Sequence, residues 1–264
     1  IDTADMYTNG NSEKMLGQFV KDGGNRDRVV IATKFSYNAE PGNPNAGGNG
    51  RKNIMRAFEG SLYRLGTDFI ALYFLLTWDS VTPAEEVMRT MDDLVTSGKV
   101  RHVALSDTPA WYVAQAQTLA KERHLEPIST VQLENSLVER NIEFEFVPMA
   151  KALGTGVMVW SPLASGLLSG KYKPSESGAE GEGRLATLAG GDNPAFNKFT
   201  AKNWKVVAEL EKVAKELNRS MAQVAVNWVV NRPGVASVLI GATKLHQLED
   251  NLGALDFTLP AELQ

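Results

Sequence analysis

The chain has 264 residues, of which 43% are hydrophobic and 22% charged, and its 27 basic and 31 acidic residues give a net charge of −4. This is ordinary globular usage, which disfavours disorder, while the absence of cysteine excludes disulfides, thiolate metal sites and a cysteine nucleophile. The mildly acidic balance argues against nucleic acid or membrane partners, and no apolar run approaches the roughly 20 residues of a membrane span. We therefore expect a cytoplasmic protein.

Short apolar runs alternate with longer amphipathic stretches along the chain. The predicted strands are a fragment at the first residues and residues 29–35, 69–76, 100–106, 130–133, 156–160 and 237–241. The predicted helices are residues 12–21, 51–65, 82–97, 110–124, 141–153, 200–218 and 220–231. This order predicts an α/β protein, a single-domain (β/α)₈ TIM barrel over residues 1–264 that lacks its first strand-helix unit. A doubly wound open sheet is the alternative.

Two segments rich in loop-forming residues, 38–50 and 173–197, each follow a predicted strand. Active sites of barrels are built at the carboxyl ends of the strands, so we expect each of these loops to cover a ligand. The alternative interpretation is a solvated linker.

Asp2, Tyr7 and Lys34 are candidates for acid–base chemistry. Asp2 ends the opening strand fragment, Tyr7 lies in the following turn, and Lys34 ends the next strand, so a barrel would bring them to one rim. A lysine in a buried apolar run needs a carboxylate partner or a chemical role. A nearby cation lowers the pKa of a tyrosine, which helps it donate a proton to a developing alkoxide. The alternative is an Asp–Lys ion pair with an unrelated tyrosine.

A set of motifs resembles the aldo-keto reductases, NADP-dependent enzymes built on a (β/α)₈ barrel. The matching segments are residues 1–7 (IDTADMY), 11–13 (NSE), 32–34 (ATK), 97–101 (SGKVR), 105–107 (LSD), 131–132 (VQ), 160–163 (WSPL), 170–172 (GKY), 240–242 (IGA), 247–248 (QL) and 251–252 (NL). They follow the family's order and spacing over nearly the whole chain. The resemblance implies that Asp2, Tyr7 and Lys34 are three members of the family's catalytic tetrad, with Tyr7 as general acid.

The resemblance also implies an NADP(H) site. Ser106, Asp107 and Gln132 would bind the nicotinamide carboxamide, although Asp107 replaces the family's usual Asn and lacks an amide donor. Trp160 would stack on the nicotinamide ring, leaving its pro-R hydride for transfer. The residues implied to line the pyrophosphate, under a loop beginning near Lys171, are Ser161, Leu163, Ser165 and Gly166. Those implied at the adenosine end are Gly241, Thr243, Lys244, Gln247, Asp250 and Asn251, with Thr243 and Lys244 facing the 2′-phosphate.

Leu76 departs from the family pattern, because the family has a histidine at this position as the fourth tetrad member. The three histidines of the chain, His102, His124 and His246, lie at a strand start or in outer helices and are no substitute. Losing one donor to a developing oxyanion lowers the rate by about 10²- to 10³-fold. These scattered histidines also give no metal-ligand cluster.

The sequence therefore predicts NADPH-dependent reduction of an aldehyde or ketone, slowed by Leu76. The main alternative is an NADP(H)-binding relative with little activity that acts as a redox-sensing or regulatory partner. A barrel hydrolase or isomerase would leave the nicotinamide and adenine motifs without a purpose. Tyr37, Trp78 and Trp111 are candidates to line the substrate pocket, but the sequence leaves the particular carbonyl substrate and the oligomeric state open.

Overall fold

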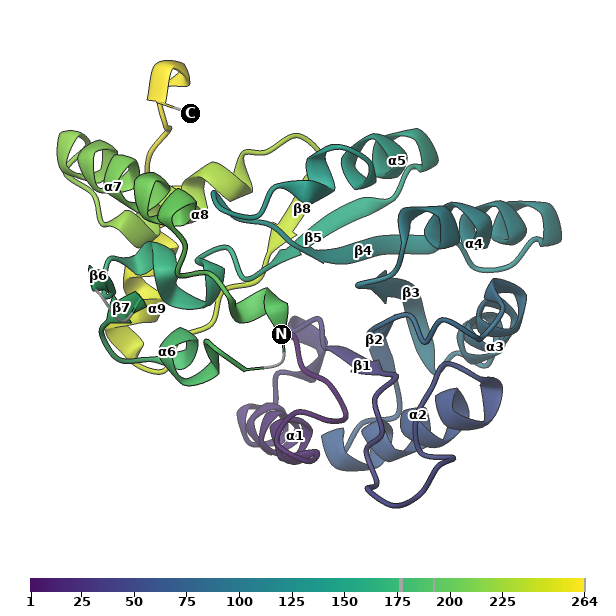
Figure 1. Ribbon diagram of the computed structural model, residues 1–264. Helices are drawn as coiled ribbons and strands as arrows, with labels where there is room; N and C mark the ends of the chain where they lie inside the picture. The colour runs from purple at the N-terminus through teal and green to yellow at the C-terminus, as the bar shows by residue number, and fades with distance from the viewer. Residues whose placement is uncertain (176–177, 192, 264) are drawn as a thin grey trace. The chain divides into compact units, whose positions relative to one another are not determined.

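The computed structural model describes residues 1–175, 178–191 and 193–263 (Figure 1). The chain divides into two compact units. The first unit comprises residues 1–132 and 148–156, and the second comprises residues 133–147 and 157–264.

The first unit contains a parallel sheet whose strands alternate with helices. In sheet order, its strands are β1 (Ala32–Phe35), β2 (Ile70–Leu75), β3 (Val100–Ser106) and β4 (Ile128–Glu134), the last continuing into the second unit. The intervening helices are α1 (Asn11–Gly23), α2 (Arg51–Leu65), α3 (Ala84–Thr96) and α4 (Ala110–Arg123). Asp2 adds a parallel bridge to Ala32 at the edge of β1, as expected for the opening strand fragment. These elements confirm the predicted α/β class.

Helix α2 illustrates how local sequence sets the boundaries. It begins at Arg51 and ends at Leu65, as predicted, because Gly66 takes a left-handed conformation (φ 62°) and its N–H closes the last turn. Helix α1 packs closely against α2 at Gly17, where an added Cβ would lie 2.4 Å from the carbonyl oxygen of Leu65. The pair covers an aromatic core that includes Phe58 and Tyr73.

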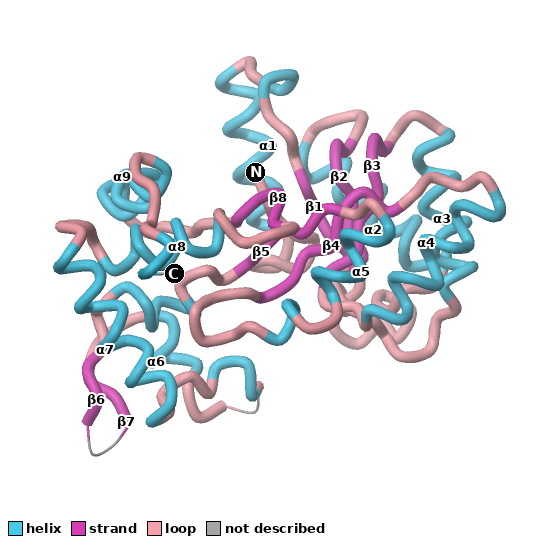
Figure 2. The backbone as a smooth tube through the Cα atoms, turned by 90° about the horizontal axis from the view of Figure 1, so that it is seen from above, coloured by secondary structure: helices cyan, strands magenta, loops and turns pink. Residues whose placement is uncertain are grey.

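The second unit contains the parallel strands β5 (Gly156–Trp160), whose first residue belongs to the first unit, and β8 (Val235–Val238), which lie side by side in Figure 2. Its helices include α7 (Ala201–Glu216), α8 (Met221–Val230) and α9 (Leu245–Leu252). Ser220 begins α8 with a capping box, because its hydroxyl accepts the Gln223 N–H and Gln223 reaches back to the Ser220 N–H. Helix α5 (Phe146–Leu153) spans both units.

Several predicted boundaries were wrong. The last strand was placed at 237–241 but occupies Val235–Val238, so Gly241 lies three residues beyond it. The predicted helix 141–153 begins as a 3₁₀ turn and becomes α-helical only at Phe146. Within the predicted loop 173–197, the structure has a short hairpin, β6 (Lys173–Ser175) and β7 (Gly178–Glu180), and helix α6 (Arg184–Leu188). Residues 176, 177 and 192 of that loop lie outside the described residues.

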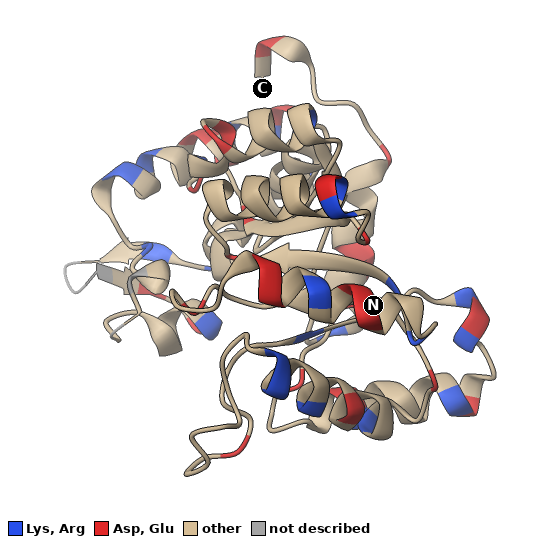
Figure 3. Cartoon of the chain, turned by 90° about the vertical axis from the view of Figure 1, so that its right-hand side faces the viewer, with Lys and Arg blue, Asp and Glu red and all other residues tan. Residues whose placement is uncertain are grey.

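Acidic and basic residues are interspersed along the helices in Figure 3. Several form pairs one helical turn apart, such as Glu85 with Arg89 and Glu211 with Lys215. Among the described residues, the helices are too short or too polar to cross a membrane.

Candidate active site

A buried ion pair forms the centre of the candidate site in the first unit. The Nζ atom of Lys34, on β1, lies 2.5 Å from Oδ1 of Asp2 and donates a second hydrogen bond to the carbonyl oxygen of Thr3 at 2.8 Å. Oδ2 of Asp2 accepts from Nε2 of Gln132 at 3.0 Å. Lys34 is fully buried, and this burial lowers its pKa, while Asp2 acts in the opposite direction by favouring the charged form.

Tyr7 lies beside this ion pair. The Nζ atom of Lys34 is 5.1 Å from the centroid of the Tyr7 ring, and Tyr7 is 39% exposed. The N–H of Tyr7 donates to the carbonyl oxygen of Ala4, which closes a tight turn after Asp2. The structure thus brings together the three residues predicted from their positions at strand ends, with the tyrosine accessible and the lysine enclosed.

The ends of β3 and β4 supply polar groups next to this cluster. Ser106 and Gln132 are register partners, and the Asp107 N–H donates to the carbonyl oxygen of Gln132. Asp107 has a left-handed backbone (φ 42°), and its charge acts to raise the pKa of Lys34. The Ser106 hydroxyl is buried without a hydrogen-bond partner among the described residues. Buried hydroxyl groups normally form hydrogen bonds, so the Ser106 hydroxyl is suited to form one with a polar group of a bound molecule, such as a carboxamide.

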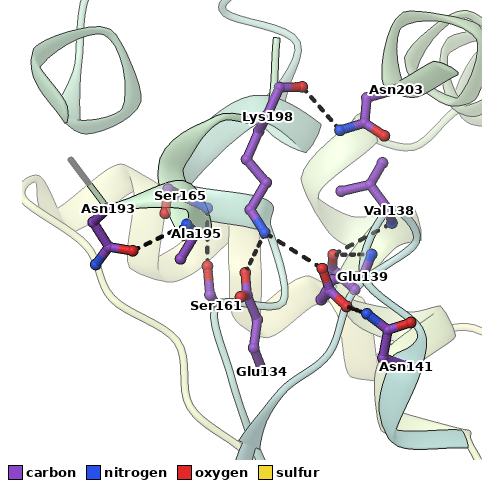
Figure 4. Close-up of polar contacts among 11 residues, drawn as sticks. Glu134, Val138, Glu139, Asn141, Ser161, Ser165, Asn193, Ala195, Lys198 and Asn203 are labelled. Atoms are coloured by element: carbon purple, nitrogen blue, oxygen red, sulfur yellow. Dashed lines mark hydrogen bonds and ion pairs between the residues drawn. The ribbon is translucent and has the colours of Figure 1, made fainter. Parts of the chain in front are cut away.

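The second unit holds the segment expected to line a pyrophosphate. After Trp160, left-handed backbone occurs at Ser161 (φ 55°) and Ser165 (φ 56°), and the Ser161 hydroxyl accepts the Ser165 N–H at 2.9 Å (Figure 4). A Cβ on Gly166 would lie 2.9 Å from Nζ of Lys171, so this ammonium group lies against the turn. A cation beside tightly turned backbone is a suitable donor set for an anion, and the segment therefore fits a phosphate group.

The residues expected at the adenosine end lie just before α9 and within it. Gly241, Thr243 and Lys244 are exposed. Oε1 of Gln247 accepts from the Thr243 N–H at 3.0 Å and from the Lys244 N–H at 3.3 Å, which fixes the entry into the helix. The last two predicted residues are Asp250, which accepts from Ser220, and Asn251, which is buried.

One described cavity lies away from this site. It has a volume of about 680 Å³ and lies before the start of β2, near Arg26, Tyr63 and Thr67. The candidate catalytic side chains lie at the carboxyl ends of the strands, which is where barrel enzymes place their chemistry.

Residues 1–263 match the sequence profile of the Aldo/keto reductase family. The chain belongs to the aldo/keto reductase family. Its relatives include an uncharacterized oxidoreductase, YrpG, of Bacillus subtilis, 36% identical over 100% of this chain and 79% of the relative. A probable voltage-gated potassium channel subunit beta of Oryza sativa subsp. japonica is 34% identical over 97% and 77%. A probable aryl-alcohol dehydrogenase, AAD4, of Saccharomyces cerevisiae is 33% identical over 99% and 80%.

Membership of the aldo/keto reductase family shows that the chain has a (β/α)₈ barrel fold and that it is an oxidoreductase. The family acts on small carbonyl compounds and generally uses NAD(P)H. The buried Ser106 hydroxyl and the Lys171 turn are the observations of this structure that fit such a cofactor.

Leu76 follows β2 in this aldo/keto reductase and is 8% exposed. Its N–H donates to the carbonyl oxygen of Phe35 at 2.8 Å, and its side chain carries no hydrogen-bond donor. The histidines are elsewhere: His102 is near the start of β3, His124 ends α4 in a left-handed conformation, and His246 is exposed on α9. The described residues contain no cluster of three acidic, histidine or cysteine side chains able to hold a metal.

Sequence reasoning missed two buried charge clusters. In the second unit, Lys198 lies 2.8 Å from Glu134 and 3.9 Å from Glu139 (Figure 4), and burial raises the pKa of Glu134 despite that cation. In the first unit, Asp5 and Glu13 are almost completely buried near Arg64. Glu134 could have been found, because it follows Gln132 at a strand end. Lys198 directly follows the predicted loop 173–197 and lies in no predicted strand or helix that would have marked it as buried.

Of the candidate substrate-lining aromatics, Tyr37 follows β1, Trp78 follows β2 and Trp111 lies in α4. Trp78 and Trp111 pack edge to face with ring centroids 5.4 Å apart, and Tyr112 adjoins both. Tyr37 and Trp111 are about half exposed. Such a group offers aromatic side chains to an aromatic or apolar compound.

Proposed function

We propose that this protein reduces an aldehyde or ketone to an alcohol with hydride from NADPH, with Tyr7 as the proton donor. The observation that carries the proposal is the enclosed Lys34 ammonium group, held by Asp2 and the Thr3 carbonyl oxygen and lying 5.1 Å from the Tyr7 ring. A buried lysine held in this way beside an accessible tyrosine matches the requirements of an acid catalyst.

Each residue of the cluster has a distinct part in the proposed mechanism. Asp2 opposes the effect of burial on Lys34 and so keeps the ammonium group charged. Gln132 holds the second oxygen of Asp2 and thereby fixes its orientation. The positive charge of Lys34 favours the phenolate that remains when Tyr7 transfers its proton to the carbonyl oxygen of the substrate.

When bound, NADPH would supply the hydride. Ser106, Asp107 and Gln132 would bind its carboxamide, Trp160 would cover one face of its ring, and Lys171 would neutralise its pyrophosphate. NADPH is proposed over NADH because exposed Thr243 and Lys244 offer a hydroxyl and a cation to the additional phosphate. Leu76 offers no hydrogen bond to the carbonyl oxygen, so we propose a turnover below that of a complete tetrad.

A second function is a regulatory subunit that binds NADP(H) and has little turnover. It is favoured by Leu76 and by the relative from Oryza sativa subsp. japonica that is named as a probable potassium channel subunit beta. It is opposed by the intact cluster of Asp2, Tyr7 and Lys34, which a purely regulatory protein would not require.

Steady-state kinetics would separate the two functions. Purified protein is mixed with NADPH and a series of aldehydes and ketones that includes benzaldehyde, and NADPH oxidation is followed by absorbance. Binding of NADPH and NADH is measured separately by fluorescence titration. Turnover that is lost in Tyr7→Phe supports the reductase, whereas tight NADPH binding without turnover of any carbonyl favours the regulator.

A further inference from the structure

Two carboxyl groups of the first unit, those of Asp5 and Glu13, are buried near β1, α1 and α2. Glu13 is 0% exposed; its Oε1 accepts from the Thr33 hydroxyl and its Oε2 from Nε of Arg64, both at 2.6 Å. Asp5 is 3% exposed, and its Oδ1 has no hydrogen-bond partner among the described residues. One carboxylate is thus fully paired while its neighbour is not, an arrangement that favours a proton on Asp5.

This carboxyl cluster lies on the opposite face of β1 from the catalytic cluster. Thr33 and Tyr73 are register partners, so their side chains share the face that Glu13 contacts. Lys34 and Phe74 are the next register pair and point to the other face, where Nζ of Lys34 meets Asp2. Asp5 and Glu13 therefore lie on the face of β1 that is turned away from Lys34.

The turn that carries Tyr7 connects Asp5 with Lys34. The Asp5 N–H donates to the carbonyl oxygen of Lys34 at 3.0 Å, and the Tyr7 N–H donates to that of Ala4 at 3.2 Å. The carbonyl oxygen of Thr3 accepts from Nζ of Lys34. A displacement of the Asp5 carboxyl group therefore moves the segment that aligns Tyr7 with Lys34.

We propose that Asp5 is a positioning residue for Tyr7, and that its carboxyl group must be protonated for the turn to hold Tyr7 in place beside Lys34. The proposal rests on the proposed function of Tyr7 as the proton donor. Asp5 does not touch the reacting atoms, and its effect passes through the turn.

The electrostatic surroundings of Asp5 support this assignment. Burial, and next the negative charge of Glu13 on α1, raise the pKa of Asp5 to about 7. Arg64 on α2, a hydrogen bond from the Met6 N–H and Arg56 on α2 act in the opposite direction. On β2 the facing titratable group is Tyr73, whose pKa is itself raised by burial and by these carboxyl groups. An ionised Asp5 would be drawn toward the two arginines and would pull on the turn, so the change takes place close to neutral pH.

The test compares the native protein with Asp5→Asn, which resembles the protonated acid, and with Asp27→Asn, a control at an exposed aspartate. The kcat/KM for benzaldehyde with NADPH is measured from about pH 5 to about pH 9. We expect the native protein and the control to lose about tenfold in kcat/KM per pH unit above the Asp5 pKa, and Asp5→Asn to lack this decrease. A uniform loss at every pH in Asp5→Asn, or an unchanged decrease, would overturn the proposal.

A second measurement does not depend on turnover. Tyrosines are labelled with ¹³C on the ring carbon that bears the hydroxyl, and the Tyr7 signal is assigned by its absence in Tyr7→Phe. We expect this signal to shift with a midpoint of about pH 7, the value at which Asp5 ionises, and Asp5→Asn to abolish that step. If no carbonyl is reduced but the step is present, the proposed function fails and the coupling stands. If the native protein reduces carbonyls and shows no such step, the role of Asp5 is wrong. If Asp5→Asn does not fold, infrared titration of the native protein measures the pH at which its buried carboxyl group ionises. A midpoint different from that of the Tyr7 step would overturn the proposal.

Discussion

The candidate catalytic cluster of the first unit and the candidate phosphate-lining segment of the second unit are built in different ways. Around Lys34 the site consists of buried side chains, and Asp2, Thr3 and Gln132 form one hydrogen-bonded network. Between Ser161 and Lys171 it consists mainly of backbone in unusual conformations with one ammonium group beside it. In the proposed function, the first arrangement would control proton transfer through fixed charges, and the second would bind an anion through its shape and the Lys171 ammonium group.

The largest effect should come from Tyr7→Phe, which removes one hydroxyl group from the side-chain site. We expect kcat to fall by about 10²- to 10⁴-fold, the usual contribution of a general acid. NADPH affinity should stay within about twofold of the native value, because this variant leaves the backbone-built segment untouched. Stopped-flow turnover and fluorescence titration provide the two measurements. Equal loss of turnover and of NADPH binding would show that the two regions are not separable.

Lys198→Met tests the buried charges of the second unit. It leaves Glu134 without its cation at 2.8 Å, so the free energy of unfolding should fall by about 3 to 5 kcal/mol. Urea unfolding provides the measurement, with Lys202→Met on the exposed surface of α7 as the matched control. Adding Glu134→Gln should restore part of the loss, since it removes the uncompensated charge. A variant as stable as the control would show that the pair contributes nothing.

Leu76→His adds a hydrogen-bond donor at the end of β2. If the carbonyl oxygen lacks such a donor in the native protein, kcat for benzaldehyde should rise by up to about 10²- to 10³-fold. Leu76→Asn, which adds a different donor, separates hydrogen bonding from ring size. Unchanged turnover in both variants would show that the position does not limit the reaction.

The Asp5 carboxyl group also makes the stability of the first unit depend on pH. It keeps its proton up to about pH 7 in the folded protein but releases it near its usual value of 3.8 when unfolded. Between these values the folded state binds more protons, so the free energy of unfolding falls as pH rises. Asp5→Asn lacks the titrating carboxyl group, so its free energy of unfolding should not show this decrease. The difference in free energy of unfolding between Asp5→Asn and the native protein should therefore increase by about 1 to 3 kcal/mol from about pH 5 to pH 7. Urea unfolding at several pH values measures the gap, and a gap independent of pH would contradict the assignment.

The two regions also differ in how well the sequence predicted them. Lys34 could be identified because a charged side chain in a buried apolar strand needs a partner. Asp2 and Tyr7 could be placed beside it because the strand ends of a barrel meet at one rim, and the structure has the three residues together. Ser161 and Lys171 came only from family resemblance, because left-handed backbone at a serine leaves no pattern in composition. The burial of the Asp5 carboxyl group could not be predicted from the sequence for another reason, because it depends on helices that are distant in sequence. Strand ends were misjudged by two or three residues where tertiary contacts outweigh local propensity, as in β8.

Isotope transfer tests the central claim most directly. NADPH deuterated on its pro-R face is incubated with benzaldehyde and either the native protein or Lys34→Met, and the alcohol is analysed by mass spectrometry. Carbonyl reduction by the proposed site predicts benzyl alcohol that carries one deuterium on carbon, formed by the native protein and strongly reduced in Lys34→Met. If NADPH binds but the native protein forms no deuterated alcohol from benzaldehyde or from any other carbonyl tested, the account of this protein as a reductase is contradicted.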